Sequence, residues 1–156
     1  MKTTLTRQEK EALLAQQDPK YATELRNSIY LQLSLNHGVP CIDLSELTWS
    51  RIDLEGGSMK LDQNDGESNR TVELSEAMVS LLQQWKEKQL HEWEKRQPGR
   101  QPLADQVFTE LDGTTLDETY ISNMVALYAE SSGIRKKIDP ESLHESSVTE
   151  ESPRNV

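Results

Sequence analysis

The chain has 156 residues, enough for one domain that buries roughly two-thirds of its unfolded surface but tight for two independent cores. With 17 Lys and Arg against 27 Asp and Glu, its net charge is -10, and such a surface repels nucleic-acid phosphate unless the cations gather on one face. No run approaches the roughly 18 uninterrupted apolar residues of a membrane span, and the N-terminus lacks the apolar stretch of a signal peptide. We therefore expect a cytoplasmic protein with no membrane partner.

The residues that hold metals and disulfides are scarce. A single cysteine, Cys41, and three scattered histidines exclude an internal disulfide and a Cys/His zinc cluster. Neither a glycine-rich phosphate loop nor a Gly-x-Ser-x-Gly elbow is present. We expect no metal, no cofactor and no small-molecule substrate.

Two helices are expected at the N-terminus. Thr6 and Glu9 have the spacing of a capping box, which predicts a helix over 6–16. Asp18 followed by proline predicts the start of a second, well-buried helix, and Gly38 is its expected left-handed cap.

The middle of the chain predicts a small sheet. A brief helix over 42–47 is followed by alternating apolar and polar residues over 49–54 and again over 58–61. The turn-forming residues 62–69 then lead to a further strand over 70–74. These segments predict a three-stranded antiparallel sheet.

The second half is expected to be helical again. Ser75 caps a third predicted helix that ends near Gln97, and 106–109 has the pattern of a short buried strand. Asp117 caps a fourth helix that stops at Gly133. The whole is a mostly helical α+β fold.

The composition changes after Ile138. Residues 139–156 are acidic and Ser-rich and offer little to bury, which is typical of a disordered tail. We therefore predict one domain over 1–138 and a disordered tail over 139–156.

Some aromatic and basic residues are candidates for contacts with nucleic acid. Trp85 and Trp93 recur with leucines on one predicted helix, which favours core packing over a base-stacking platform. The one basic triplet follows a helix C-terminus, where cations either compensate the helix dipole or contact phosphate. The candidate nucleic-acid contacts are Arg70, Arg135, Lys136 and Lys137.

Several segments, taken in order, resemble one family. Residues 38–54 (GVPCIDLSELTWSRIDL) resemble the Gly-Leu-Arg-x-Ser-Glu-Leu-x-x-Leu-x-Trp segment of the tyrosine recombinase (phage integrase) catalytic domain. Residues 70–75 resemble the Arg-x-Val-Pro-Leu-Ser that ends its sheet, and 106–114 its Val-Phe strand and turn. Residues 138–145 are similar to the lead-in to its His-x-Leu-Arg-His box. The resemblance covers roughly 5–147 and implies the fold of that domain.

The resemblance also implies a site, in which two arginines, a lysine and histidines stabilise a scissile phosphate while a tyrosine attacks it. The family's first Arg, hairpin Lys, box His and box Arg correspond to Pro40, Asp65, Glu141 and His144. No later segment supplies the tyrosine nucleophile, since the last tyrosine is Tyr128, in a predicted core helix. We therefore expect no strand-transfer activity.

These substitutions predict a catalytically inactive recombinase-like domain that serves as a regulatory or accessory binding module in phage or mobile-element DNA biology. Its partner would be a protein, or DNA bound weakly through another face. One alternative is a fragment of an integrase active in site-specific recombination. Another is an unrelated α+β protein-interaction domain.

Overall fold

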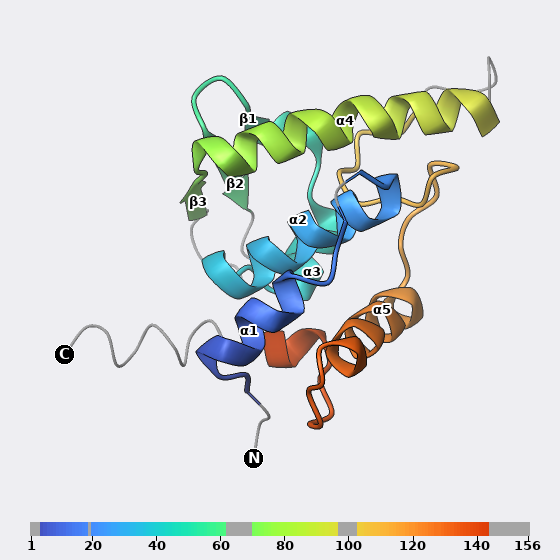
Figure 1. The fold of residues 1–156 in the computed structure, drawn as a ribbon. Helices are drawn as coiled ribbons and strands as arrows, with labels where there is room; N and C mark the ends of the chain where they lie inside the picture. The colour runs from blue at the N-terminus through green and yellow to red at the C-terminus, as the bar shows by residue number, and fades with distance from the viewer. Residues whose placement is uncertain (1–3, 19, 62–69, 97–102, 144–156) are drawn as a thin grey trace.

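The computed structural model describes residues 4–18, 20–61, 70–96 and 103–143. Its helices are α1 (Arg7–Leu14), α2 (Ala22–His37), α3 (Cys41–Glu46), α4 (Glu76–Arg96) and α5 (Glu118–Ser131). A 3-10 turn, η1 (Trp49–Arg51), precedes the strands β1 (Ile52–Asp53), β2 (Ser58–Leu61) and β3 (Arg70–Glu73). The prediction of a mostly helical α+β fold with a three-stranded antiparallel sheet is confirmed (Figure 1).

Helix α1 begins with the predicted capping box. The Thr6 hydroxyl accepts from the Glu9 backbone N–H at 3.1 Å, and the Glu9 carboxylate accepts from the Thr6 N–H at 2.9 Å. Two backbone donors that the helix itself leaves unpaired are thus satisfied.

Helix α2 begins later than predicted. Asp18 does not cap it, because the Asp18 carboxylate instead accepts from the Lys20 N–H at 3.1 Å and closes a local turn. Tyr21 occupies the N-cap without a side-chain hydrogen bond. The C-terminal prediction is confirmed, since Gly38 takes the left-handed conformation with φ 66°.

Helix α2 is the centre of the molecule. It packs against α4 on one side and α1 on another, and α1 in turn contacts α5 (Figure 1). Its buried residues are Leu25, Arg26, Asn27, Ile29, Tyr30, Leu31, Leu33, Ser34 and Leu35. A helix buried on most of its circumference is stabilised mainly by packing rather than by intrinsic propensity.

The prediction of a strand over 49–54 is mostly wrong. Residues 49–51 form η1, because the Trp49 N–H donates to Asp105 O at 2.8 Å, outside the sheet. The ladder starts only where Ile52 pairs with Met59. The predicted turn over 62–69 lies outside the described residues.

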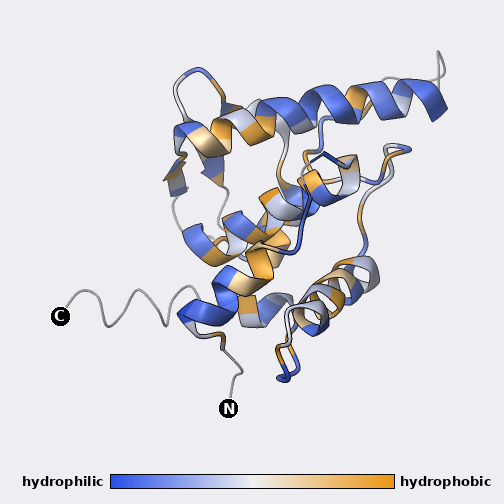
Figure 2. Ribbon diagram, viewed as in Figure 1, coloured by the Kyte–Doolittle hydropathy of each residue, from blue (hydrophilic) through white to orange (hydrophobic). Residues whose placement is uncertain are grey.

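Helix α4 is amphipathic, with a hydrophilic outer face (Figure 2). Trp85 is fully buried, as predicted, whereas Trp93 is only half-buried and covers Gly113. A Cβ at Gly113 would lie 2.8 Å from the Trp93 ring, and its φ of +91° also favours glycine. Trp93 therefore packs at the edge of the fold and not in its hydrophobic core.

The segment 106–109 is buried but is not a strand. It pairs with neighbouring backbone only through two isolated bridges. Side chains of α4 hold it instead: the Trp85 indole donates to Val107 O at 2.7 Å, and the Gln89 amide donates to Thr109 Oγ1 at 2.9 Å. Because these side chains satisfy its polar groups, the segment is secured without a ladder.

The sequence predicted a disordered tail from residue 139 onward. This prediction is wrong for residues 139–143. Residues 140–143 form one helical turn, in which Ser142 and Leu143 are 6 % and 0 % exposed. Leu143 is one of the most deeply buried side chains, so the packed domain extends at least to it. The rest of the predicted tail, 144–156, lies outside the described residues.

Candidate functional site

Two of the positions that the resemblance assigned to catalysis line one cavity. Pro40 and Glu141, far apart in the sequence, both border a cavity of about 650 Å³. The start of α3, the start of α5 and the turn 139–143 form its walls. The fold thus brings together the segments that the resemblance aligned with the recombinase site.

The end of α2 places Pro40. Gly38 reverses the chain, the Val39 N–H donates to Leu33 O at 3.3 Å, and Pro40 then occupies the N-cap of α3 with φ −63° and ψ 151°. At this corner Pro40 offers the cavity neither a charge nor an N–H donor.

The turn after Ile138 places Glu141. The Asp139 carboxylate accepts from the backbone N–H and the hydroxyl of Ser142, both at 2.9 Å, and buried Leu143 anchors the other end. Glu141 itself is exposed between these two anchors. Its backbone position is therefore well defined at the cavity rim.

The cavity has an acidic lining. Glu118, Asp139 and Glu141 border it, and no Lys, Arg or His lies among the lining residues that the structure describes. Carboxylates near one another repel an anion and attract a cation. The cavity is therefore suited to a neutral or positively charged group and unsuited to a phosphate.

Arg70 is engaged at the end of α2. Its guanidinium donates to His37 O at 2.6 Å and to Gly38 O at 3.5 Å, where helix carbonyls lack internal partners. Burial, and secondarily the Arg70 charge, lower the pKa of His37. Arg70 thus holds β3 against the corner that carries Pro40.

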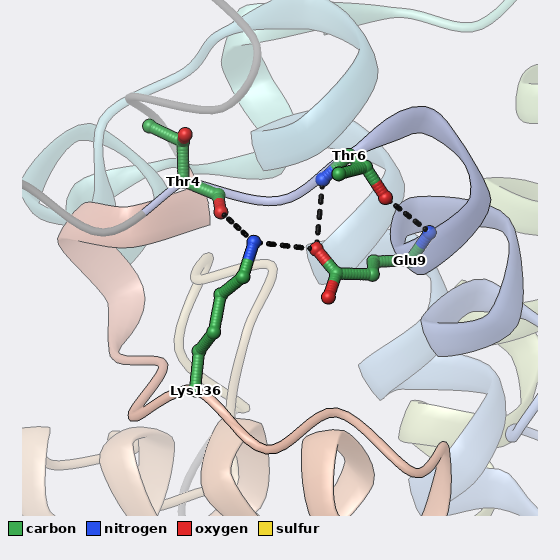
Figure 3. Close-up of polar contacts among 4 residues, drawn as sticks. All are labelled: Thr4, Thr6, Glu9 and Lys136. Carbon is green, nitrogen blue, oxygen red and sulfur yellow. Dashed lines mark hydrogen bonds and ion pairs between the residues drawn. The ribbon is translucent and has the colours of Figure 1, made fainter.

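The three residues of the basic triplet, 135–137, differ in their contacts. The Lys136 ammonium donates to Thr4 O at 2.9 Å and to the Glu9 carboxylate at 2.8 Å, and so joins the capping box of α1 (Figure 3). The hydrogen bond from Lys136 is the main cause that lowers the pKa of Glu9. All three side chains are exposed, but Lys136 is held by these contacts, which leaves Arg135 and Lys137 as the candidates for contacts with another molecule.

Asp65 and His144, the other two positions aligned with catalytic residues, lie outside the described residues. Among the residues that are described, no group of three or more His, Cys, Asp or Glu could hold a metal ion. In the same part of the chain, no helix is both long and apolar enough to cross a membrane.

A buried polar cluster between α2 and α5 was missed by sequence reasoning. Arg26 is 1 % exposed and donates to Asn27 Oδ1 at 2.9–3.0 Å, to Thr109 O at 3.0 Å and to the Tyr120 hydroxyl. The Asn27 amide donates to the Tyr128 hydroxyl at 3.1 Å. The sequence does contain a signal that Arg26 is buried, because its position falls on the same helical face as Ala22 and Ile29.

Solved structures confirm the fold. The XerA recombinase superposes with a TM-score of 0.77 at 21% identity, over 99% of this chain and 52% of that one. The XerH recombinase bound to its difH substrate gives 0.77 at 20% identity, over 99% and 44%. The lambda integrase catalytic core gives 0.68 at 15% identity, over 98% and 85%. The chain thus spans about half the length of the XerA chain.

Among curated proteins, none matches this sequence. A family model does match: the phage integrase family, over residues 3–150. The idea of an unrelated α+β domain is thereby excluded. Because the match extends over nearly the whole chain, the protein belongs to the phage integrase family.

Proposed function

We propose that this protein is a recombinase-like domain without strand-cleavage activity, acting in the cytoplasm as a regulatory or accessory binding module in phage or mobile-element DNA biology. One observation carries the proposal. A single cavity is bordered by Pro40 and Glu141, the two positions that the resemblance aligns with catalytic residues, and by Glu118 and Asp139.

Strand cleavage depends on cations that stabilise the charge developing on the scissile phosphate. Two charges about 4 Å apart interact by about 1 kcal/mol in water and by about 4 kcal/mol near a protein surface. Under the alignment that the resemblance implies, Pro40 in place of an arginine removes one such attraction, and Glu141 in place of a histidine introduces a repulsion. Both changes disfavour a phosphate in this cavity.

Two modes of action are compatible with such a module. Protein contacts are favoured by the acidic cavity and by the net charge of -10. Weak DNA binding would use the exposed side chains Arg135 and Lys137. The second candidate function, a fragment of an active integrase, is supported by the likeness to XerH bound to difH.

A covalent-capture assay separates the module from the integrase fragment. The full chain is incubated with nicked duplex DNA that traps any 3′-phosphotyrosyl intermediate, and the products are run on a denaturing gel with the lambda integrase catalytic core as positive control. We expect no adduct. An adduct that survives denaturation would overturn the proposal.

A DNA-binding assay tests the role of the cavity. We expect the double variant Pro40→Arg/Glu141→His to bind labelled duplex DNA at least about tenfold more tightly than wild type at about 50 mM salt, and to lose that gain near 200 mM. Fluorescence anisotropy measures both. The control Gln83→Arg/Glu94→His makes the same charge change on exposed positions of α4. Equal gains from both variants would show that the cavity does not face the DNA.

A further inference from the structure

A second cavity adjoins the first along α5. It has a volume of about 430 Å³ and lies between α2 and α5, bordered by Asn27, Met124, Leu127 and Tyr128. Asn123 borders both cavities. We call these two neighbouring cavities, which share Asn123 in their lining, the α5 groove.

The charged side chains of the α5 groove share one sign. Glu118, Asp139 and Glu141 border the first cavity, and Glu24 borders the second. Within the described part of the chain, the lining includes no Lys, Arg or His. Such a uniform lining selects a positively charged occupant and steers it by long-range attraction.

The α5 groove also presents apolar surface to solvent. Leu127 is 64% exposed and Ile42 is 54% exposed, one in each cavity. Leu127 borders the same cavity as Tyr120, Met124 and Tyr128, and apolar side chains that gather at one place and are rimmed by polar groups are typical of interaction sites.

The tyrosines of the second cavity have their hydroxyls engaged internally. Tyr120 accepts from buried Arg26, and Tyr128 accepts from the Asn27 amide. The Arg26 guanidinium also lies 5.1 Å from the centroid of the Tyr120 ring. Both rings are therefore held in fixed positions at the border of the cavity, where an incoming apolar side chain can contact them.

We propose that the α5 groove binds a basic amphipathic segment of a partner protein, with Arg or Lys placed against the carboxylates and an apolar residue placed on Leu127 and Tyr128. From Glu118 to Leu127 the groove follows α5 for about 14 Å, the length of a helical segment of about ten residues. The inference rests on the proposed function and deepens it by giving the partner's chemistry. DNA is disfavoured as an occupant because it carries the charge of the groove itself.

A peptide selection tests this inference. A displayed library of random 16-residue peptides is panned on the immobilised full chain and counter-selected on the triple variant Glu118→Gln/Glu141→Gln/Leu127→Ser. We expect enriched peptides with Arg or Lys three or four positions from Leu, Ile or Phe. Their binding, measured by fluorescence anisotropy, is expected to weaken between about 50 and 200 mM salt.

Single variants assign the contacts. Glu118→Gln and Glu141→Gln are each expected to weaken the selected peptides about fivefold, and Leu127→Ser about tenfold. The matched controls Glu94→Gln and Leu90→Ser alter exposed positions of α4 and are expected to change binding less than about twofold. Thermal unfolding of each variant verifies that it is folded.

Three results would overturn the inference: no enrichment, enriched peptides without positive charge, or equal binding to the groove and control variants. Self-association that only the groove variants abolish, seen by sedimentation, would assign the groove to a second copy and also overturn it. The cleavage assay stays independent. A covalent DNA adduct removes the proposed function even if peptides bind, whereas failed selection without an adduct removes this inference alone.

Discussion

The α4 side and the α5 side of the fold satisfy their buried polar groups in different ways. Toward α4, Gln89 is 1% exposed, accepts from the Trp49 indole at 2.8 Å and donates to the segment 106–109. All of these groups are neutral. Toward α5, the buried group is the cation Arg26, whose partners among the described residues are neutral oxygens.

The two networks meet at Thr109. Its hydroxyl accepts from Gln89, and its carbonyl accepts from Arg26. The α4 side has bulky buried side chains such as Trp85, whereas the α5 side is bordered by the α5 groove. The comparison indicates that the α4 side supplies most of the stability, while the α5 side keeps an open surface on a rigid base.

The largest expected effect tests the α4 side. Trp85→Ala removes a fully buried ring and its hydrogen bond to Val107 O, and we expect it to lower the free energy of unfolding by about 3–5 kcal/mol. Urea denaturation measures the change. The control Leu127→Ala, on the exposed surface of α5, is expected to change stability by less than about 0.5 kcal/mol. Similar losses from both variants would contradict the division of roles.

A smaller effect is expected at the base of the α5 side. Arg26→Met leaves Asn27 Oδ1, Thr109 O and the Tyr120 hydroxyl without their donor, which we expect to lower the free energy of unfolding by about 2–3 kcal/mol. Arg26→Lys keeps the charge but not the planar set of donors, so its loss is expected to be intermediate. Urea denaturation of both variants checks the order. A Met variant as stable as wild type would show that the cation is not needed to hold α5.

The smallest expected effect on stability concerns the ion pair between Lys136, which follows α5, and Glu9 of α1. Lys136 lowers the pKa of Glu9 below its ordinary 4.5, so the stabilisation is present above pH 4.5 and is lost as pH falls through the lower folded-state pKa. We expect Lys136→Met to be less stable than wild type by under about 1 kcal/mol at pH 7. Most of that difference should vanish in acid.

Thermal unfolding at several pH values measures the Lys136 effect. Lys137→Met removes the neighbouring exposed charge and serves as the control. If both variants lose the same stability, or if the loss persists unchanged at low pH, the contact with Glu9 is not the source of the Lys136 effect.

Much of the fold could be predicted because its signals are local. The capping box of Thr6 and Glu9 and the left-handed Gly38 depend on neighbouring residues alone. The predictions failed where a distant group intervened. Trp49 is drawn out of the predicted strand by Asp105 O, and 106–109 is held by side chains of α4 rather than by a ladder.

The candidate site was predictable only in part. The resemblance identified Pro40 and Glu141 as positions of interest, and both border the same cavity. The α5 groove could not be predicted, because the carboxylates and exposed leucine that characterise it come from three separate segments: α2, α5 and the turn 139–143. The sequence places Tyr128 in a predicted core helix, and nothing local shows that its hydroxyl accepts a hydrogen bond from Asn27 of α2.

The sequence by itself determined the family and the order of the elements, because each depends on residue identity and spacing along the chain. Through the resemblance, it also predicted that Pro40 and Glu141 stand at catalytic positions of the family. Only the tertiary structure decided that Leu143 belongs to the domain, that Lys136 binds the capping box, and that the acidic residues surround one groove. The physical reason is that burial and charge interactions depend on distance in space, which packing sets between segments far apart in the chain.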